Sequence, residues 1–214
     1  MRDLLDMAAR HADAAELYIV NSEVIPVTFE MNKLKHAETR RMQGVALRVI
    51  KSGRVGFSSS TDTGESAAQE LINAAVDSAD MGEPAKFDLP GPAPGGKSAA
   101  PLVYDDRIAG LDADALIRMG QEIVDIIIEC DPSIKCDVQL ERKVEDIAIA
   151  NSSLGGGNYR KTTLTAMAGA LLVEGNDIFE VFDMDGSCCS DFDHRSIAHE
   201  VLERVRLGRR IAEV

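Results

Sequence analysis

QGVALRVIKSGRVGFSSSTD, residues 43–62, contains the pattern of a β-hairpin followed by the start of a helix. Val45, Leu47 and Val49 recur at every second position, as they do in a strand that buries one face. Ser52-Gly53 predicts a tight turn, because glycine adopts positive φ at no steric cost. "RVGFSSS" then predicts an antiparallel return strand, so the stretch indicates a meander of short strands.

The hydroxyl row from Ser58 to Thr61 has two interpretations, a nucleophilic site or the end of a strand. A nucleophilic serine needs a base and an orienting group, and no G-x-S-x-G elbow is present. Asp62 is followed three residues later by Glu65, which is the spacing of a helix capping box. We therefore interpret the row as the junction between a strand and a helix.

The sequence predicts the same order of elements twice, once in each half of the chain. Ile25, Val27 and Phe29 alternate in a strand, and Pro26 places that strand at a sheet edge because proline has no N–H to donate. The small and apolar residues of 162–173 predict a central strand that is covered on both faces. The expected helices are 2–12, 64–81, 112–130 and one starting near 191, and the expected strands are 25–31, 33–39, 44–51, 54–60, 135–143, 146–151, 162–173 and 178–185.

The sequence therefore predicts an α+β fold made of two repeats of helix–four antiparallel strands–helix. The first repeat spans residues 1–82 and the second spans 111–214. A Pro/Gly-rich linker at 83–110 joins them, since residues 83–102 hold five of the seven prolines.

Composition restricts the possible partners and location. The formal net charge is −13 and Trp is absent, so direct binding to nucleic acid is not expected. No apolar run approaches the ~20 residues of a membrane helix, and the N-terminus lacks the pattern of a signal peptide. The four cysteines lack zinc-ligand spacing and are predicted to be thiols in a reducing compartment, so we expect a cytoplasmic protein without membrane contact.

Three further stretches are near misses to known sites. His199-Glu200 lacks the second histidine of H-E-x-x-H, because Glu203 stands in that position. Residues 155–163 resemble a P-loop with Arg160 in place of its second glycine, and we interpret them as a loop between strands. Weak cation binding stays open for four acids that lack the order of a calcium loop, which are Asp183, Asp185, Asp191 and Asp193. No catalytic, cofactor-binding or metal-binding residue is predicted in this chain.

The opening stretch and its surroundings also resemble a known family. "AELYIVNSEVIPVTFEMNKLKHAETRRMQGVALRVIKSGRVGFSSSTD" resembles the start of the TldD/PmbA family, also called modulators of DNA gyrase. Gly44, Val49, Gly56 and the row from Ser58 to Asp62 stand where the family has its hairpin residues. "NSSLGGGNYRKTTLTAMAGALLVEGNDIFEVFD" is similar, more loosely, to the family's second-half segment. The second hairpin is slightly more similar to the PmbA (TldE) branch.

The resemblance implies a non-catalytic N-terminal part of a TldD/PmbA-like metallopeptidase or of its partner subunit. Such a part would help to form a cavity for the proteolysis or maturation of unfolded peptides. Zinc is implied only in a C-terminal part or a partner subunit, because the TldD branch carries its H-E-x-x-x-H type motif there. We expect a homo-oligomer or a TldD-like partner subunit, and a chain that continues beyond Val214. The alternative is an acidic protein-interaction module, like a DNA gyrase modulator, without enzymatic activity.

Overall fold

The protein was analysed as a computed structural model, which describes residues 2–62, 64–92, 103–175 and 177–212. The fold is α+β, as predicted. The helices are α1 (Arg2–Ala8), α2 (Glu65–Ala79), α3 (Asp106–Ala109), α4 (Ala113–Cys130) and α5 (His194–Ala212), and the strands are β1 (Ala14–Glu30), β2 (Lys33–Ala37), β3 (Arg40–Lys51), β4 (Arg54–Ser60), β5 (Lys135–Asn151), β6 (Gly156–Glu174) and β7 (Asp177–Ser187).

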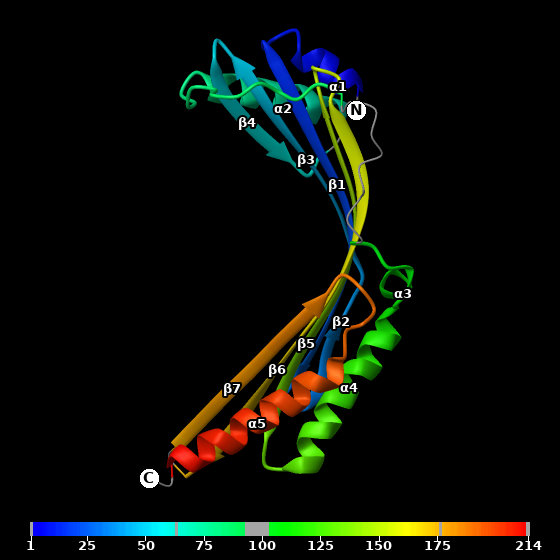
Figure 1. The fold of residues 1–214 in the computed structure, drawn as a ribbon, viewed down its shortest axis with the longest axis vertical. Helices are drawn as coiled ribbons and strands as arrows, with labels where there is room; N and C mark the ends of the chain where they lie inside the picture. The colour runs from blue at the N-terminus through cyan, green and yellow to red at the C-terminus, as the bar shows by residue number, and fades with distance from the viewer. Residues whose placement is uncertain (1, 63, 93–102, 176, 213–214) are drawn as a thin grey trace. The chain divides into compact units, whose positions relative to one another are not determined.

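The strands form a seven-stranded sheet in the order β4-β3-β1-β5-β6-β7, with β2 also paired to β1 (Figure 1). The hairpin pairs β3–β4 and β6–β7 are antiparallel and join neighbours in sequence. The pair β1–β5 joins strands that are more than a hundred residues apart, so the two halves of the chain share the sheet.

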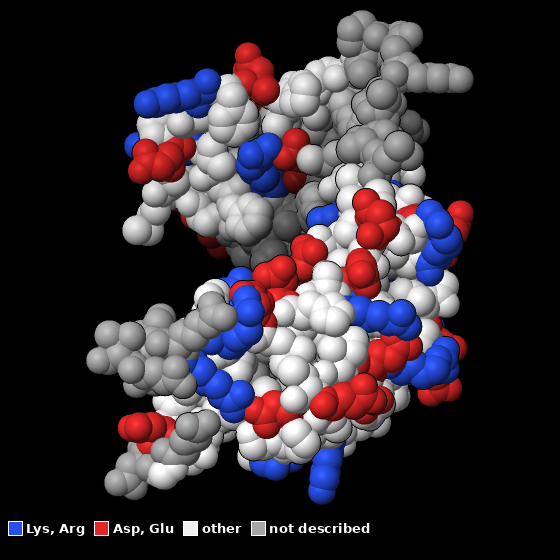
Figure 2. Space-filling view, turned by 60° about the horizontal axis from the view of Figure 1, so that its bottom comes forward, with Lys and Arg blue, Asp and Glu red and all other residues white. Residues whose placement is uncertain are grey.

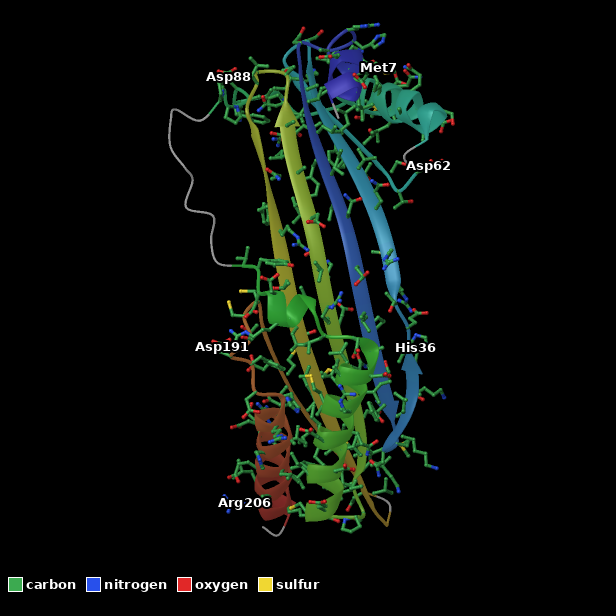
Figure 3. The ribbon with its side chains drawn as sticks, turned by 90° about the vertical axis from the view of Figure 1, so that its right-hand side faces the viewer. Met7, His36, Asp62, Asp88, Asp191 and Arg206 are labelled. Atoms are coloured by element: carbon green, nitrogen blue, oxygen red, sulfur yellow. The ribbon has the colours of Figure 1, made fainter. Side chains whose placement is uncertain are left out.

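The chain divides into two compact units, and each has its own hydrophobic core. Unit 1 comprises Met1–Ser22, Arg41–Pro101 and Glu145–Arg160, and unit 2 comprises Glu23–Arg40, Leu102–Val144 and Lys161–Val214. In unit 1, Leu17, Leu47 and Ile72 are fully buried between the strands and the helices α1 and α2. In unit 2, α4 and α5 pack against each other and against one face of the sheet (Figure 3). The predicted division into 1–82, 83–110 and 111–214 stays a prediction. The two compact units describe which residues lie close together, and they do not show which segment folds independently.

The hairpin of the opening stretch forms as the sequence predicts. Val45, Leu47 and Val49 are buried on one face of β3. Ser52 and Gly53 have φ values of 50° and 72°, which suit a two-residue turn between antiparallel strands. Gly53 meets no close neighbour at its missing Cβ, so the turn uses its backbone freedom and not its small size.

The predicted repeat is not confirmed, because the second half has three strands where four were predicted. Residues 135–143 and 146–151 form one continuous strand, β5. Val144 and Glu145, which separated the two predicted strands, include no turn former, so the strand runs through them. Arg142 points inward, where it donates to Glu23 Oε1 at 2.8 Å and to the Ala109 carbonyl at 2.9 Å. A charge that is paired and hydrogen-bonded in this way can lie inside a strand.

The placement of Pro26 at a sheet edge is wrong. β1 lies between β3 and β5, so it is central. The Pro26 carbonyl accepts a hydrogen bond from the Glu38 N–H, and both ladder groups of a residue point to the same neighbouring strand in an antiparallel pair. The missing N–H of Pro26 therefore faces the gap between β2 and β3, where a donor has no regular partner.

β6 is interior to the sheet, but the prediction that both of its faces are covered is wrong. One face is buried and consists of small and branched residues, among them Ala168 and Leu172. On the other face, Val173 is 60 % exposed and Met167 is half-buried. The helices of unit 2 thus leave one face of β6 and β7 exposed, and this face carries the candidate site.

Candidate functional site

The hydroxyl row from Ser58 to Thr61 makes hydrogen bonds that stabilise the end of β4 and the turn toward α2. Ser58 Oγ donates to the Leu71 carbonyl of α2 at 2.6 Å. Ser60 Oγ accepts from the Asp62 N–H at 3.0 Å, which turns the chain toward α2. Ser59, Ser60 and Thr61 also line a shallow hollow of about 560 Å³ in unit 1, whose described lining contains no His, Cys, Asp or Glu. The interpretation as a junction between strand and helix is confirmed.

The predicted capping box at the start of α2 is wrong in its first residue. The N-cap is Gly64, which has no side-chain capping bond, and Asp62 lies outside the helix. Asp62 Oδ1 accepts from the Gly64 N–H at 2.9 Å, so the carboxylate orders the turn before the helix. The side chain of Glu65 lies outside the described residues.

The near-miss motifs do not come together as a site. His199 is exposed on α5. Residues 156–163 belong to β6, so the predicted loop is limited to a turn that ends at Gly155. Asp183 accepts from Arg204 and Asp191 accepts from the Ser187 hydroxyl. Asp185 and Asp193 accept from the backbone N–H groups of Gly186 and Arg195, so all four acids serve local contacts. Across residues 2–62, 64–92, 103–175 and 177–212, the structure gathers no three His, Cys, Asp or Glu residues as metal ligands would be.

The strands at the two ends of the strand order, β4 and β7, differ, and the difference identifies a candidate site. β4 ends the sheet in unit 1, and its outward backbone groups are used by the chain itself. The Val55 N–H donates to the Glu83 carbonyl at 2.9 Å, and the Phe57 N–H donates to Ser78 Oγ at 2.8 Å. Ser78 Oγ in turn donates to the Phe57 carbonyl at 3.1 Å. This edge is therefore closed to another strand.

β7 ends the sheet in unit 2, and among the described strands only β6 pairs with it. It is eleven residues long and has no proline or bulge that would discourage further pairing. Because every residue from Asp177 to Ser187 pairs with β6 in unbroken register, the strand is regular along its length. A regular edge of this kind offers a ladder of backbone groups to an added strand.

An apolar strip lies beside this edge, on the face that the helices leave exposed. Phe182, Met184 and Ile178 of β7 are 60 %, 63 % and 73 % exposed. They pair directly with Gly169, Met167 and Val173 of β6, and paired residues share a face. We call this set, with Leu171 opposite Glu180, the β7 strip. Exposed apolar side chains in one group mark interaction surfaces in soluble proteins.

The β7 strip continues into a hollow of about 250 Å³ on the same sheet. Thr28, Gln139, Glu141 and Thr165 supply polar groups from three strands, and Met167 and Met184 supply apolar walls. The volume is below that of typical small-molecule pockets, ~300–1,000 Å³, so the hollow suits one side chain of a longer partner.

The charged residues of β7 are all acidic. Residues 177–187 carry four acids and no Lys or Arg. Asp183 is bonded by Arg204 of α5, on the helix side, and Glu180 lies within the β7 strip. An added strand that alternates apolar and basic side chains would match this surface better than a second copy of the acidic β7.

The sequence analysis missed the β7 strip, although part of its signal was present. Residues 178–185 were predicted to be a strand, and the alternation of Ile178, Glu180, Phe182 and Met184 was visible. The position of β7 at an edge depends on the pairing of β1 with β5, which local patterns do not reveal.

Comparison with known proteins supports the family resemblance. Residues 15–79 match the family model described as PmbA/TldA metallopeptidase domain 1. TldE from Thermococcus kodakarensis has a similar fold, with 18% identity and a TM-score of 0.80 over 96% of this chain and 47% of its own. A candidate modulator of DNA gyrase from Bacteroides thetaiotaomicron has 19% identity and a TM-score of 0.81, over 95% of this chain and 48% of its own. A search of curated proteins finds no match.

The resemblance of the chain to the N-terminal domain of the TldD/PmbA family is thus confirmed, by the family model over 15–79 and by the fold over most of the chain. The chain spans slightly less than half the length of each of these structures. No helix among the described residues is long and apolar enough to cross a membrane.

Proposed function

We propose that this chain is the non-catalytic N-terminal part of a TldD/PmbA-like metallopeptidase or of its partner subunit, and that it helps to form a cavity for peptide proteolysis or maturation. The observation that carries the proposal is the match of residues 15–79 to the first domain of this metallopeptidase family. The similar fold of TldE supports the same assignment. A cytoplasmic location and assembly as a homo-oligomer or with a TldD-like subunit belong to the same proposal.

In this proposal the β7 strip receives an extended peptide segment as an added strand. The regular register of β7 supports this role, since an edge strand recognises a peptide through main-chain hydrogen bonds. The exposed Phe182 and Met184 would contact alternate side chains of the peptide. Unfolded peptides fit such a site because their backbone groups are available.

The bond-breaking chemistry is assigned to another part of the assembly. The family resemblance implies zinc in a C-terminal part or in a TldD-like partner subunit, and the proposal keeps the metal there. The role of this chain is then to bind and orient the peptide, which contributes to catalysis by lowering the entropy cost of bringing the reactants together.

Co-expression of the full chain with a TldD-like subunit tests the proposal. We expect a complex that hydrolyses an unstructured protein such as β-casein faster than the TldD-like subunit alone, and we expect a zinc chelator to abolish the activity. A matched sample with Phe182→Thr reports whether the β7 strip contributes. Failure of the chain to form the complex or to change the rate would contradict the proposed function.

The alternative, an acidic module that binds DNA gyrase by resembling DNA, gains no support from the surface. DNA mimicry needs a continuous array of negative charge. On the face drawn in Figure 2, Lys and Arg are interspersed with Asp and Glu. Ion pairs such as Arg204–Asp183 also join opposite charges on the protein. The name of DNA gyrase modulator belongs to the structurally similar protein from Bacteroides thetaiotaomicron.

A further inference from the structure

Two adjacent thiols lie where β7 ends, outside the β7 strip. Cys188 and Cys189 follow the last residue of β7, and their sulfur atoms are 3.8 Å apart. Both residues are half-buried and are thiols in this structure. Figure 3 labels Asp191 in the same segment, which leads from β7 into α5.

The backbone around the pair is tied to residues 103–110. Thr162 is fully buried, and its Oγ1 donates to the Cys188 carbonyl at 2.9 Å. The same Oγ1 accepts from the Asp105 N–H at 3.0 Å, and Asp105 Oδ2 accepts from the Ser190 N–H at 2.8 Å. The peptide group between the two cysteines is therefore one anchor of the segment that leads into α3.

A bond between these sulfurs would disturb this anchor. Disulfide sulfurs lie about 2.05 Å apart, so the pair must approach by more than an ångström. Neighbouring Cα atoms lie about 3.8 Å apart, below the ~4.4–6.8 Å that disulfides usually span, so the eight-membered ring is strained and easily reduced. The Cys188–Cys189 peptide group must rotate to close the ring, and its carbonyl then turns away from Thr162.

We propose that Cys188 and Cys189 form a reversible modification site that low-molecular-weight disulfides close to a vicinal disulfide, and that closure loosens the contacts of Asp105 with Thr162 of β6 and with Ser190. The exchange is balanced. One protein thiolate attacks the small disulfide and releases the first small thiol. The second protein thiolate then attacks the mixed disulfide and releases the other small thiol, so the protein pair is oxidised and the small disulfide is reduced.

The other cysteines differ from this pair in ways that make the reaction selective. Cys136 is buried in unit 2, and burial raises the pKa of its thiol to about 12, so it reacts slowly. Cys130 is exposed on α4 and is expected to keep a mixed disulfide. The hydrogen bond with Cys188, followed by burial and nearby negative charge, raises the pKa of the Cys189 thiol, so closure should accelerate as pH rises.

Oxidised glutathione applied to the full chain with Cys130→Ser tests the site. Trypsin releases residues 162–195 as one peptide that contains both thiols and no other cysteine. We expect this peptide to lose the mass of two hydrogens, without added glutathione, and to regain it with dithiothreitol. With Cys189→Ser we expect glutathione to stay attached to Cys188. A wild-type pair that retains glutathione and forms no internal bond would overturn the proposal.

Hydrogen exchange measures the structural consequence in the same samples. We expect the amides of Asp105 and Ser190 to exchange about tenfold faster after oxidation, as the loss of one hydrogen bond allows. Thr162→Val should produce the same acceleration in the reduced protein. Unchanged protection of both amides after closure would show that the pair does not control this segment.

Discussion

The strands β4 and β7, at the two ends of the strand order, are edge strands with opposite chemical character. β4 in unit 1 is closed by its own chain, through Ser78 of α2 and the segment that contains Glu83. β7 in unit 2 has an unbroken register with β6, and the two strands share an exposed apolar strip on the face that the helices leave open. Each edge strand carries an exposed phenylalanine, Phe57 at 58 % and Phe182 at 60 %, so exposed hydrophobicity alone does not distinguish them.

The difference indicates that free backbone groups, more than exposed apolar surface, decide whether an edge strand can accept another strand. Natural proteins usually protect sheet edges, because an open edge pairs with other chains. The protection of β4 by two separate segments indicates that this rule applies here, and the regular, acidic β7 departs from it. We therefore expect changes at β4 to affect stability and changes at β7 to affect peptide binding.

Gly82→Ala should have the largest effect on the free energy of unfolding. A Cβ at Gly82 would lie 1.8 Å from the Val55 carbonyl oxygen, and backbone cannot yield cheaply. The residue must move away from β4, and we expect a loss of about 2–3 kcal/mol. Urea denaturation measures the change. Gly91→Ala, whose new Cβ would have its nearest neighbour at 3.9 Å, should stay within about 0.5 kcal/mol, and an equal loss in both variants would contradict this account.

Ser78→Ala should lower the unfolding free energy by about 1–2 kcal/mol. The change removes the hydroxyl that both accepts from the Phe57 N–H and donates to the Phe57 carbonyl. The matched control is Ser66→Ala, at an exposed position in α2. Hydrogen exchange of the Phe57 amide should accelerate only in Ser78→Ala. A Phe57 amide that stays protected would show that β4 is closed by other groups.

Acid should weaken the support of β7. Hydrogen bonds from the Ser133 hydroxyl, the Arg209 guanidinium and the Ser133 backbone lower the pKa of Asp131 from 3.8 to about 2. Because the folded-state pKa lies below the unfolded value, the stabilisation is complete above pH ~4 and is lost as pH falls toward 2. Its size is on the order of 1 kcal/mol, allowing for partial exposure.

Asp131 stabilises α5 beneath β7 through its ion pair with Arg209. Denaturation followed between pH 4 and pH 2 should therefore show a shallower decline in Asp131→Asn than in the wild type. An identical decline in the two proteins would mean that Asp131 does not carry this stabilisation.

Phe182→Thr should change the unfolding free energy least, by less than about 0.5 kcal/mol, because the side chain is exposed and threonine suits a strand. We expect its affinity for an extended peptide to fall about tenfold, as the loss of an apolar anchor implies. Phe57→Thr on β4 is the matched control and should keep the wild-type affinity. Fluorescence anisotropy of a labelled unstructured peptide measures both, and equal losses would remove the distinction between the edges.

Much of the fold was predictable where local chemistry determines it. The Ser52-Gly53 turn and the buried alternation of Val45, Leu47 and Val49 follow from glycine geometry and strand periodicity. The continuity of β5 was not predictable, because nothing local to Val144 and Glu145 distinguishes one long strand from two short ones. The burial of Arg142 in this strand depends on its partner Glu23, which lies far along the chain. The predicted edge position of Pro26 was wrong for a similar reason, because it depends on how distant strands are arranged. Pro26 lies in a central strand, at the gap between β2 and β3.

The candidate site was predictable only in part. The strand at 178–185 and its exposed alternation could be read from the sequence, and so could the absence of zinc-ligand spacing. The order of the strands could not, because it depends on the pairing of β1 with β5, which is set by burial on both sides of the sheet. Whether a strand lies at an edge depends on the pairing of the whole sheet, so it cannot be predicted from a local sequence pattern.

Hydrogen exchange of the full chain with a synthetic peptide of alternating Val and Lys tests whether β7 accepts a strand. The account predicts slower exchange in residues 177–187, no change in residues 54–60, and loss of the protection in Phe182→Thr. Peptide binding that leaves β7 unprotected, or that protects β4 instead, would contradict it.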